Sequence, residues 1–307
     1  MKDFKVKFRG VRGSFPVANE KFLRYGGNTA CVEINAGGHI IVLDAGTGIV
    51  NLGDELVTEY ISSGLEPKDR DPIKVSILLS HIHQDHLLGL TFFKPLHLKS
   101  TELKIYGIGS QNSDLLQNLS DLFFGKTFPL NLSDIACKYE VNNICEDYAI
   151  LFKPKSAPEL VLKKGLKPEG DDVVVTFYKS FVHPQDGVLV YKISYKGKSV
   201  VYATDKECYF GGDKKFIKFA KNCDLLIHDS QYTSEDYLNL QSPKQGYGHS
   251  TFDMAIETQK QAKAKNLAFF HYDPSYNDSM LDRIKELYTT TNKNVIMSHE
   301  GLELEVE

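Results

Sequence analysis

The stretch Ile73–Leu90, IKVSILLSHIHQDHLLGL, decides the fold. Its first half is a run of apolar and β-branched residues that is typical of a buried strand, and the run ends at Ser80. Three histidines and one aspartate then follow within six residues: His81, His83, Asp85 and His86. Burying so many imidazole and carboxylate groups without partners is costly, and an exposed loop rarely collects them by chance. The pattern therefore predicts a strand that delivers metal ligands at its carboxyl end.

Imidazole nitrogens and carboxylate oxygens together suit zinc, and they tolerate manganese or iron. Side chains two residues apart in the turn can converge on one ion, while Asp85 and His86 can face a second. Four donors cannot complete the coordination of two ions, so we expect further ligands at other strand ends. Three polar residues follow apolar runs in this way: His183, Asp205 and His271. Each alone would be read as a cap or as a core hydrogen-bonding group, but together with the cluster they favour metal binding.

Short apolar runs recur along the chain and alternate with helical patterns, which predicts a layered α/β fold. The pair of runs at 188–203, turning at Tyr195–Lys198, reads as an antiparallel hairpin, so the sheets should be mixed. Thr251 and Asp278 are the expected N-caps of two helices. Helical periodicity is visible in six segments: 48–61, 86–93, 110–122, 213–221, 251–265 and 278–290.

No repeat or flexible linker divides the chain, so we expect one domain over residues 1–307. The segment from about 151 to 172 differs from its surroundings, because it is rich in lysine and proline and shows little periodicity. We read it as a surface insertion. Its lysines are expected to form a solvated face, with a nucleotide-contacting lid as the minority interpretation.

The composition narrows the class of protein. The 307 residues carry a formal net charge of −4, which gives no bulk attraction for nucleic acid, so an anionic substrate must be held by a local site. Five cysteines without a CxxC pair suit a reducing compartment. The amino-terminal residues have no apolar segment of a signal peptide, and no apolar run approaches the roughly 20 residues that span a bilayer. We therefore expect a cytoplasmic protein without a membrane partner.

The histidine cluster at 81–86 and the later His183, Asp205 and His271 resemble the metallo-β-lactamase fold hydrolases. The signature of that family is HxHxDH, followed by a distant His, Asp and His. The resemblance implies an αββα sandwich with a binuclear metal site at one edge. By this resemblance, one ion would be held by His81, His83 and His183, and the other by Asp85, His86 and His271. Asp205 would bridge the two ions. Asp44, in LDAGTG, matches the aspartate that supports a ligand histidine.

Further segments resemble the ribonuclease Z and phosphonate-operon phosphodiesterase branch: RGS at 12–14, YGGNT at 25–29 and GHST at 248–251. In ribonuclease Z a histidine of the HST segment assists phosphodiester cleavage, so His249 is an expected catalytic residue. The second expected catalytic residue is Asp85 of the HxHxDH cluster. The other reading of this segment is a helix cap at Thr251. The Gly/Pro-rich arm with which ribonuclease Z grips tRNA is not visible. His228 also ends an apolar run, and both support of a ligand and a plain core hydrogen bond are open for it.

These features predict a hydrolase with two divalent ions, zinc by preference, that cleaves a phosphodiester through a metal-bound hydroxide. Two divalent ions set against Asp85, Asp205 and a hydroxide leave a positively charged site that complements a phosphodiester monoanion. The first expectation is a small nucleotide or cyclic nucleotide as substrate. The alternatives are tRNA 3′-processing with RNA as partner, thioester or lactone hydrolysis, and a non-catalytic nucleotide-binding relative. A homodimer is possible.

Overall fold

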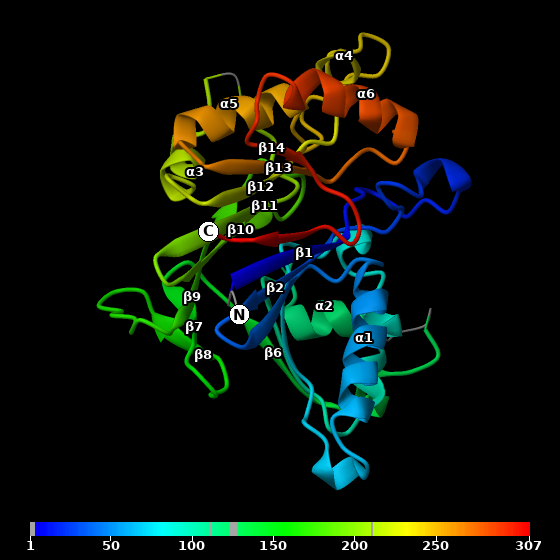
Figure 1. Ribbon diagram of the computed structural model, residues 1–307, viewed down its shortest axis with the longest axis vertical. Coiled ribbons are helices and arrows are strands. Elements are labelled where there is room, and N and C mark those ends of the chain that lie inside the picture. Colours follow the sequence, from blue (N-terminus) through cyan, green and yellow to red (C-terminus); the bar gives the residue numbers. More distant parts are fainter. Residues whose placement is uncertain (1–3, 111, 123–127, 210) are drawn as a thin grey trace.

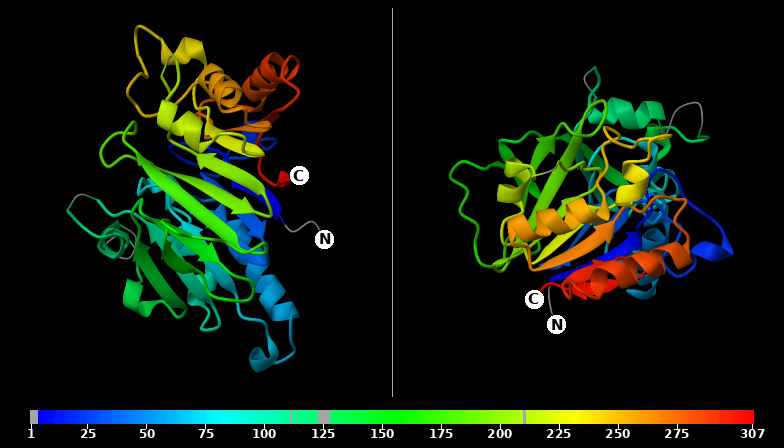
Figure 2. Two further views of the ribbon diagram at one scale, coloured as in Figure 1. Left: turned by 90° about the vertical axis from the view of Figure 1, so that its left-hand side faces the viewer. Right: turned by 90° about the horizontal axis from the view of Figure 1, so that it is seen from above.

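The computed structural model describes residues 4–110, 112–122, 128–209 and 211–307. Two β-sheets lie face to face, and helices cover the outer face of each (Figures 1 and 2). In the described part of the chain the first sheet has seven strands, in the order β15 (Glu303–Glu305), β1 (Phe4–Gly10), β2 (Cys31–Ala36), β3 (His39–Leu43), β4 (Lys74–Leu78), β5 (Glu102–Gly107) and β6 (Lys138–Asn143). The second sheet has eight, in the order β14 (Val295–Met297), β13 (Asn266–Phe270), β12 (Leu225–Asp229), β11 (Lys198–Ala203), β10 (Val188–Tyr195), β9 (Val173–Ser180), β7 (Tyr148–Phe152) and β8 (Glu159–Leu162). The predicted αββα arrangement is confirmed.

Both sheets are mixed, as the sequence predicts. Strands β3 to β6 are parallel, whereas β1, β2 and β15 pair antiparallel. In the second sheet β11 to β14 are parallel, and β10 pairs antiparallel with both β9 and β11. The expected hairpin at 188–203 is therefore confirmed. Because β9 and β11 both oppose β10, the carboxyl ends of β9, β11, β12 and β13 lie at one edge of their sheet.

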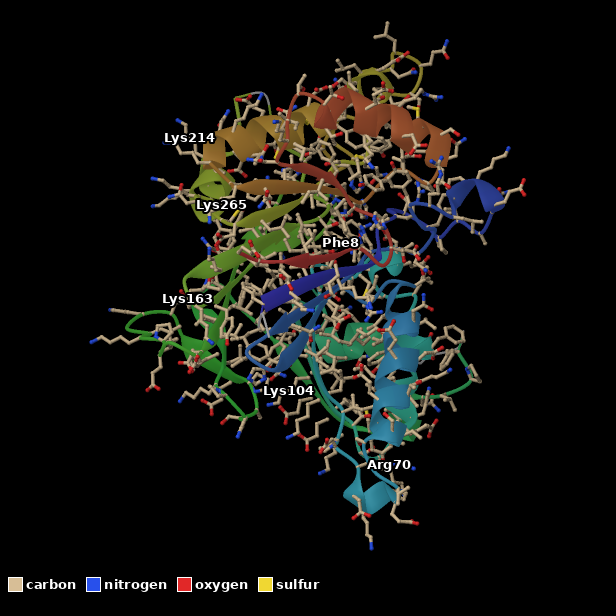
Figure 3. All side chains as sticks on the ribbon, in the orientation of Figure 1. Phe8, Arg70, Lys104, Lys163, Lys214 and Lys265 are labelled. Carbon is tan, nitrogen blue, oxygen red and sulfur yellow. The ribbon has the colours of Figure 1, made fainter. Side chains whose placement is uncertain are left out.

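Apolar side chains alternate along the strands and fill two cores. In β3, Ile41 and Leu43 belong to the larger core between the sheets, whereas Val42 faces the smaller core beneath α1. Phe8 is fully buried between the sheets, and Lys163, Lys214 and Lys265 lie at the periphery (Figure 3). The α-helices within the described residues are α1 (Ile49–Ser62), α2 (Leu115–Leu122), α3 (Lys214–Phe219), α4 (Ser234–Tyr237), α5 (Phe252–Ala262) and α6 (Asp278–Thr289).

Three helix predictions need correction. The segment 86–93 forms two short 3₁₀ turns instead of an α-helix, because its backbone bonds to the loop after β3: Ala45 N donates to His86 O and Gly89 N donates to Ala45 O. The helix expected over 110–122 begins only at Leu115, and residue 111 of that span lies outside the described residues. The cap of α6 is Asn277, whose Oδ1 accepts from Met280 N, and Asp278 is the first helical residue.

The cap predicted at Thr251 is confirmed, because its Oγ1 accepts from Met254 N at the start of α5.

The lysine-rich segment that the sequence marks at about 151–172 contains β8, which pairs with β7 as a hairpin at the sheet edge. The tip of this hairpin lies beside the start of β3, where His39 Nε2 is 3.0 Å from Lys153 O. Among the described residues no helix combines the length and apolar character needed to cross a bilayer.

Candidate metal centre

The strand directions bring the seven predicted ligands to one place between the sheets. His81 follows β4 of the first sheet, and His83, Asp85 and His86 occupy the turn behind it. His183, Asp205 and His271 follow β9, β11 and β13 of the second sheet. All seven approach from carboxyl ends of strands, where side chains of an open α/β sheet converge. The seven residues fall into two clusters that share Asp205.

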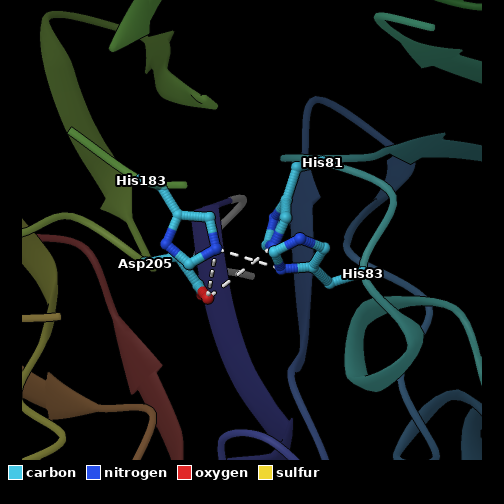
Figure 4. Close-up of side chains that lie close together, drawn as sticks. All are labelled: His81, His83, His183 and Asp205. Carbon is cyan, nitrogen blue, oxygen red and sulfur yellow. Dashed lines mark hydrogen bonds and ion pairs between the residues drawn. The ribbon is translucent and has the colours of Figure 1, made fainter. Parts of the chain in front are cut away.

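The first cluster contains three histidines and one aspartate, and Figure 4 shows their side chains facing one another. The ring of His81 lies 4.4 Å from that of His83 and 4.8 Å from that of His183, measured between centroids. His183 Nε2 lies 3.0 Å from His83 Nδ1. The potential ligand atoms of these three histidines and Asp205 all lie within 4.8 Å of one another. This arrangement suits one divalent ion.

The second cluster contains Asp85, His86 and His271, whose ligand atoms also lie within 4.8 Å of one another. Asp85 Oδ2 is 3.3 Å from His86 Nε2 and 3.2 Å from His271 Nε2. The carboxylate of Asp85 is held in place because Ser14 N donates to Oδ2 at 2.7 Å. Ser14 belongs to the RGS segment, so that segment positions one of the expected ligands.

Asp205 lies between the clusters and presents a different oxygen to each. Its Oδ2 is 3.7 Å from His81 Nε2 and 3.6 Å from His183 Nε2. Its Oδ1 is 3.1 Å from His86 Nε2 and 3.2 Å from His271 Nε2. This geometry is the one required of a carboxylate that bridges two ions.

The hydrogen bonds of His81 and His183 leave one ring nitrogen of each for the site. His81 Nδ1 lies 3.0 Å from Ser80 Oγ, and His183 Nδ1 lies 3.4 Å from the carbonyl of Gly248. Since each Nδ1–H has an acceptor, Nε2 keeps a lone pair directed at the cluster. His81 Nε2 is buried and has no hydrogen-bond partner. An orphaned imidazole nitrogen among three further donors fits a divalent cation, so the residues present suit the group that they are expected to hold.

Asp44 supports the second cluster from below. Its Oδ2 accepts from His86 Nδ1 at 2.8 Å, which fixes the ring with Nε2 toward the site. The same carboxylate accepts from Ser80 N, Ser80 Oγ and the hydroxyl of Tyr202. Asp44 therefore joins the ends of β3, β4 and β11 while it orients the ring of His86, an expected ligand.

Three of these residues have an unusual backbone conformation. Asp44, Asp205 and His271 have φ values of 62°, 49° and 66°, in the left-handed region that side chains other than glycine rarely adopt. Asp44 and His271 stand directly after a strand and Asp205 one residue further on, where the chain must turn sharply. Such strain persists only where the surrounding structure imposes it, and it concentrates at functional sites.

The charges of the metal-free clusters differ. Burial lowers the pKa of His183 to about 4 and lowers the pKa of His81 well below its ordinary value, so both rings are neutral. For His86 burial acts in the same direction, but Asp85, Asp205 and Asp44 together raise its pKa well above the ordinary value. The three carboxylates thus favour the protonated form of His86.

His249, the expected proton donor, borders both clusters. Its ring stacks on that of His271 at 5.1 Å and lies 5.2 Å from that of His183. Its Nδ1 is 2.8 Å from Asp229 Oδ2. Although burial lowers the pKa of His249, the charge of Asp229 and this hydrogen bond raise it to about 9. Thr251, two residues further on, caps α5, which confirms the cap interpretation of the GHST segment. The catalytic role of His249 stays a prediction.

The sequence reasoning overlooked Asp229 and Gln231. Asp229 is the last residue of β12 and accepts from His249, from Ser250 N and from Asp205 N. Gln231 Oε1 lies 2.9 Å from His271 Nδ1 and orients that ligand. Asp229 ends an apolar run like the other site residues, so the same signal was present. Gln231 has no such mark, because its role depends on a contact across 40 residues.

His228 is not brought to the metal clusters. Its Nδ1 lies 2.6 Å from the carbonyl of Asp229, and its Nε2 lies 3.5 Å from Cys208 Sγ. The ring also packs against Phe216. These contacts are those of a core hydrogen-bonding residue, one of the two roles left open for it.

The sequence of the chain is similar to a known protein family and to curated proteins. A family described as "Beta-lactamase superfamily domain" matches residues 39–272. A curated relative named ribonuclease Z, from Picrophilus torridus, is 24% identical over 335 residues, which cover 99% of this chain and 96% of the relative.

Two solved structures share the fold over the whole chain. One is a diphosphatase from the PhnP family, with a TM-score of 0.64, 16% identity and coverage of 99% of this chain and 98% of that one. The other is the short form of human tRNase Z, with a TM-score of 0.58, 17% identity and coverage of 99% of both chains. At these identities the likeness establishes the fold.

Proposed function

The chain belongs to the β-lactamase superfamily, and on that premise we propose that it is a metal-dependent phosphodiesterase that hydrolyses RNA. The observation that carries the proposal is the pair formed by His249 and Asp229 beside Asp205. His249 Nδ1 is 2.8 Å from Asp229 and 3.9 Å from Asp205 Oδ2. A proton donor thus lies next to two clusters that suit divalent ions, which are the groups that phosphodiester hydrolysis needs.

Each residue has a distinct task in this proposal. Two bound divalent ions would activate a water molecule and polarise a phosphoryl oxygen. Asp205 presents one carboxylate oxygen to each cluster and so fixes their separation. Asp44 and Gln231 hold the rings of His86 and His271 in place. Asp229 occupies Nδ1 of His249, which leaves Nε2 to give a proton to the departing alkoxide. This transfer contributes typically about 10²–10⁴-fold to such a reaction.

RNA is favoured over a small nucleotide because curated relatives named ribonuclease Z align with almost the entire chain. The second candidate is the small or cyclic nucleotide expected from the sequence. The observation that favours it is the lack of a Gly/Pro-rich arm in the sequence. Both candidates share the same chemistry and differ in what binds beside the scissile phosphate.

A substrate panel tests the proposal. Metal-loaded protein is incubated with precursor tRNA, cyclic nucleotides, dinucleotides, bis(p-nitrophenyl) phosphate and S-lactoylglutathione, and metal content is measured on the same preparation. We expect cleavage of precursor tRNA and of the simple diester. Hydrolysis of S-lactoylglutathione alone would favour the thioester alternative. Binding of nucleotide without hydrolysis of any diester would favour a non-catalytic relative.

The role of His249 is tested through the leaving group. His249→Ala should retain both ions and lose about 10²–10⁴-fold in kcat on RNA. The loss on bis(p-nitrophenyl) phosphate should be smaller, since p-nitrophenolate departs without a proton. An unaltered rate on RNA would remove His249 from the mechanism.

Asp229→Asn tests the positioning role of Asp229 through a pH profile. A proton donor works at a pH below its pKa, and Asp229 raises the pKa of His249. The asparagine variant lowers that pKa, so the alkaline fall of kcat should move to lower pH. A profile that keeps its shape while the rate drops at every pH would instead indicate general structural damage.

A further inference from the structure

Exposed aromatic rings recur in the chain segments that carry the site residues. In the described part of the chain six aromatic side chains are exposed, and five of them lie in loops that carry site residues: Phe15, Phe92, Phe181, Tyr209 and Tyr247. Phe181, 78% exposed, stands two residues before His183, and Tyr247 stands two residues before His249. Single exposed rings are common on protein surfaces, but a concentration beside an active-site candidate indicates a binding surface.

Two of these rings are paired with lysines. Lys179 Nζ lies 5.4 Å from the ring centroid of Phe181, and Lys244 Nζ lies 5.6 Å from that of Tyr247. We call them the aromatic–lysine pairs. They lie on adjoining loops, because His183 and His249, to which they lead, have rings 5.2 Å apart and Gly248 O is 3.4 Å from His183 Nδ1. Each lysine lies over its ring, and the rings remain largely exposed, Phe181 to 78% and Tyr247 to 53%.

We propose that the aromatic–lysine pairs bind unpaired nucleotides of an RNA strand next to the scissile phosphate. This inference rests on the proposed function and specifies how its substrate is held. Exposed aromatic rings stack on any base, and adjacent cations track the backbone, which is the pattern of sites for single-stranded nucleic acid. A chain with a net charge of −4 has no general attraction for RNA, so it needs such local contacts.

A surface for a protein partner is the less favoured interpretation. Hydrophobic interfaces have apolar centres depleted of lysine. Here a lysine accompanies each of the two rings. An aromatic ring beside a lysine suits RNA, which has flat bases and a negatively charged backbone, better than it suits an apolar protein surface.

The test compares two substrates and three variants. A single-stranded oligoribonucleotide is set against the same backbone with stable abasic residues on both sides of the cleavage position. Phe181→Leu and Tyr247→Leu remove the ring and keep apolar bulk, whereas Phe181→Tyr keeps a ring. Each leucine variant should lower kcat/KM on the base-bearing strand about tenfold, within the range for loss of one base–aromatic stack. Loss on the abasic strand should be under about twofold, and Phe181→Tyr should restore most of the rate.

Leu65→Ala is the control. Leu65 is 95% exposed and lies beyond the carboxyl end of α1. Since α1 starts beside the site and runs away from it for 14 residues, about 20 Å, this substitution should alter neither reaction. Equal losses on the base-bearing and abasic strands in the leucine variants would overturn the proposal, because base stacking would then not be involved.

A binding measurement separates this inference from the proposed function. Fluorescence anisotropy with a labelled phosphorothioate oligoribonucleotide, which resists hydrolysis, reports affinity for metal-loaded protein even if no diester is cleaved. The leucine variants should raise Kd about tenfold. An unchanged Kd would refute the pairs as an RNA site whether or not the enzyme is active. A change of oligomeric state in Phe181→Leu on size-exclusion chromatography would instead identify a subunit interface.

Discussion

Asp205 is the side chain on which the metal centre depends most, because its two oxygens face different clusters. Asp205→Ala should abolish hydrolysis and lower the content of both ions. His83→Ala removes a donor from the first cluster only, so it should abolish hydrolysis and reduce the metal content from two ions to one. Both losses should exceed the roughly 100-fold that removal of an outer partner of a ligand costs. Elemental analysis of the purified variants checks the stoichiometry, and full metal occupancy in Asp205→Ala would contradict the bridging role.

The two clusters should differ in the pH at which they bind their ions. In the first, burial lowers the pKa values of His81, His83 and His183, so these rings are already neutral and protons compete only in acid. In the second, His86 has a raised pKa and must release a proton before it can bind. As pH falls from 8 to 5, the second ion should be lost first.

Metal titrations by calorimetry at several pH values check this order. One site should bind with little proton release and the other with release of about one proton. Simultaneous loss of both ions on acidification, or earlier loss from the three-histidine cluster, would contradict the assignment of charge.

At the scale of residues, the sequence predicts seven candidate ligands, and the structure brings all seven together. Their common signal is a polar residue after an apolar run, and Asp229 carries the same signal. Gln231 was not predictable, because its contact with His271 joins residues 40 positions apart. A polar residue at a strand end does not always belong to the site. His228 stands near the end of β12, yet its ring turns toward Cys208.

The loop between α4 and α5 positions His183 through a glycine. Gly248 has a φ of 93°, and a Cβ there would lie 2.1 Å from His183 Nδ1. Gly248→Ala should therefore displace His183 and deplete the first cluster of its ion. Gly246→Ala is the matched control, because Gly246 has a similar φ of 84° but open space around it.

Both glycine variants bear the cost of a left-handed residue, about 1–2 kcal/mol, and only Gly248→Ala adds the clash. Metal analysis and thermal unfolding of the pair separate the two effects. Equal metal content in both variants would show that His183 tolerates the added carbon.

At the scale of elements, boundaries were harder to predict than identities. The periodicity of 86–93 is helical, but the backbone of this turn bonds to the loop after β3, and it forms 3₁₀ turns. Asn277 and Asp278 are both good capping residues, but the carboxylate of Asp278 accepts hydrogen bonds from Arg24 N and Tyr25 N instead, and Asn277 caps the helix. Distant hydrogen bonds compete with local ones at these positions, so the sequence of one segment alone does not predict where its helix begins or ends.

The two ions would link the two sheets, because each cluster draws ligands from both. Removal of the ions with a chelator should therefore destabilise the whole fold. A free ion concentration of 100 times Kd contributes about 2.7 kcal/mol per ion to the free energy of unfolding, which corresponds to roughly 4 °C in Tm per ion for a chain of 307 residues.

Thermal unfolding with and without chelator measures this effect. Asp205→Ala serves as control, since a protein that cannot hold the ions should respond little to the chelator. Identical melting of chelated and metal-loaded wild-type protein would show that the ions do not join the sheets.

At the scale of the molecule, the layered arrangement and the mixed sheets followed from alternating strand and helix patterns and the hairpin at 188–203. Sheet order did not follow, because β15 at the carboxyl end pairs with β1 at the amino end. A pairing across nearly the whole chain leaves no local mark on either strand. The edge at which the ligands meet was nevertheless predictable, since it is fixed by strand direction.

The most direct test is an anomalous-difference map from crystals of the metal-loaded protein. Two peaks should lie about 3.5–4 Å apart, one on either side of the Asp205 carboxylate. One should be surrounded by His81, His83 and His183, and the other by Asp85, His86 and His271. A map without a peak between the sheets, or with a single ion that Asp205 does not touch, would contradict the account.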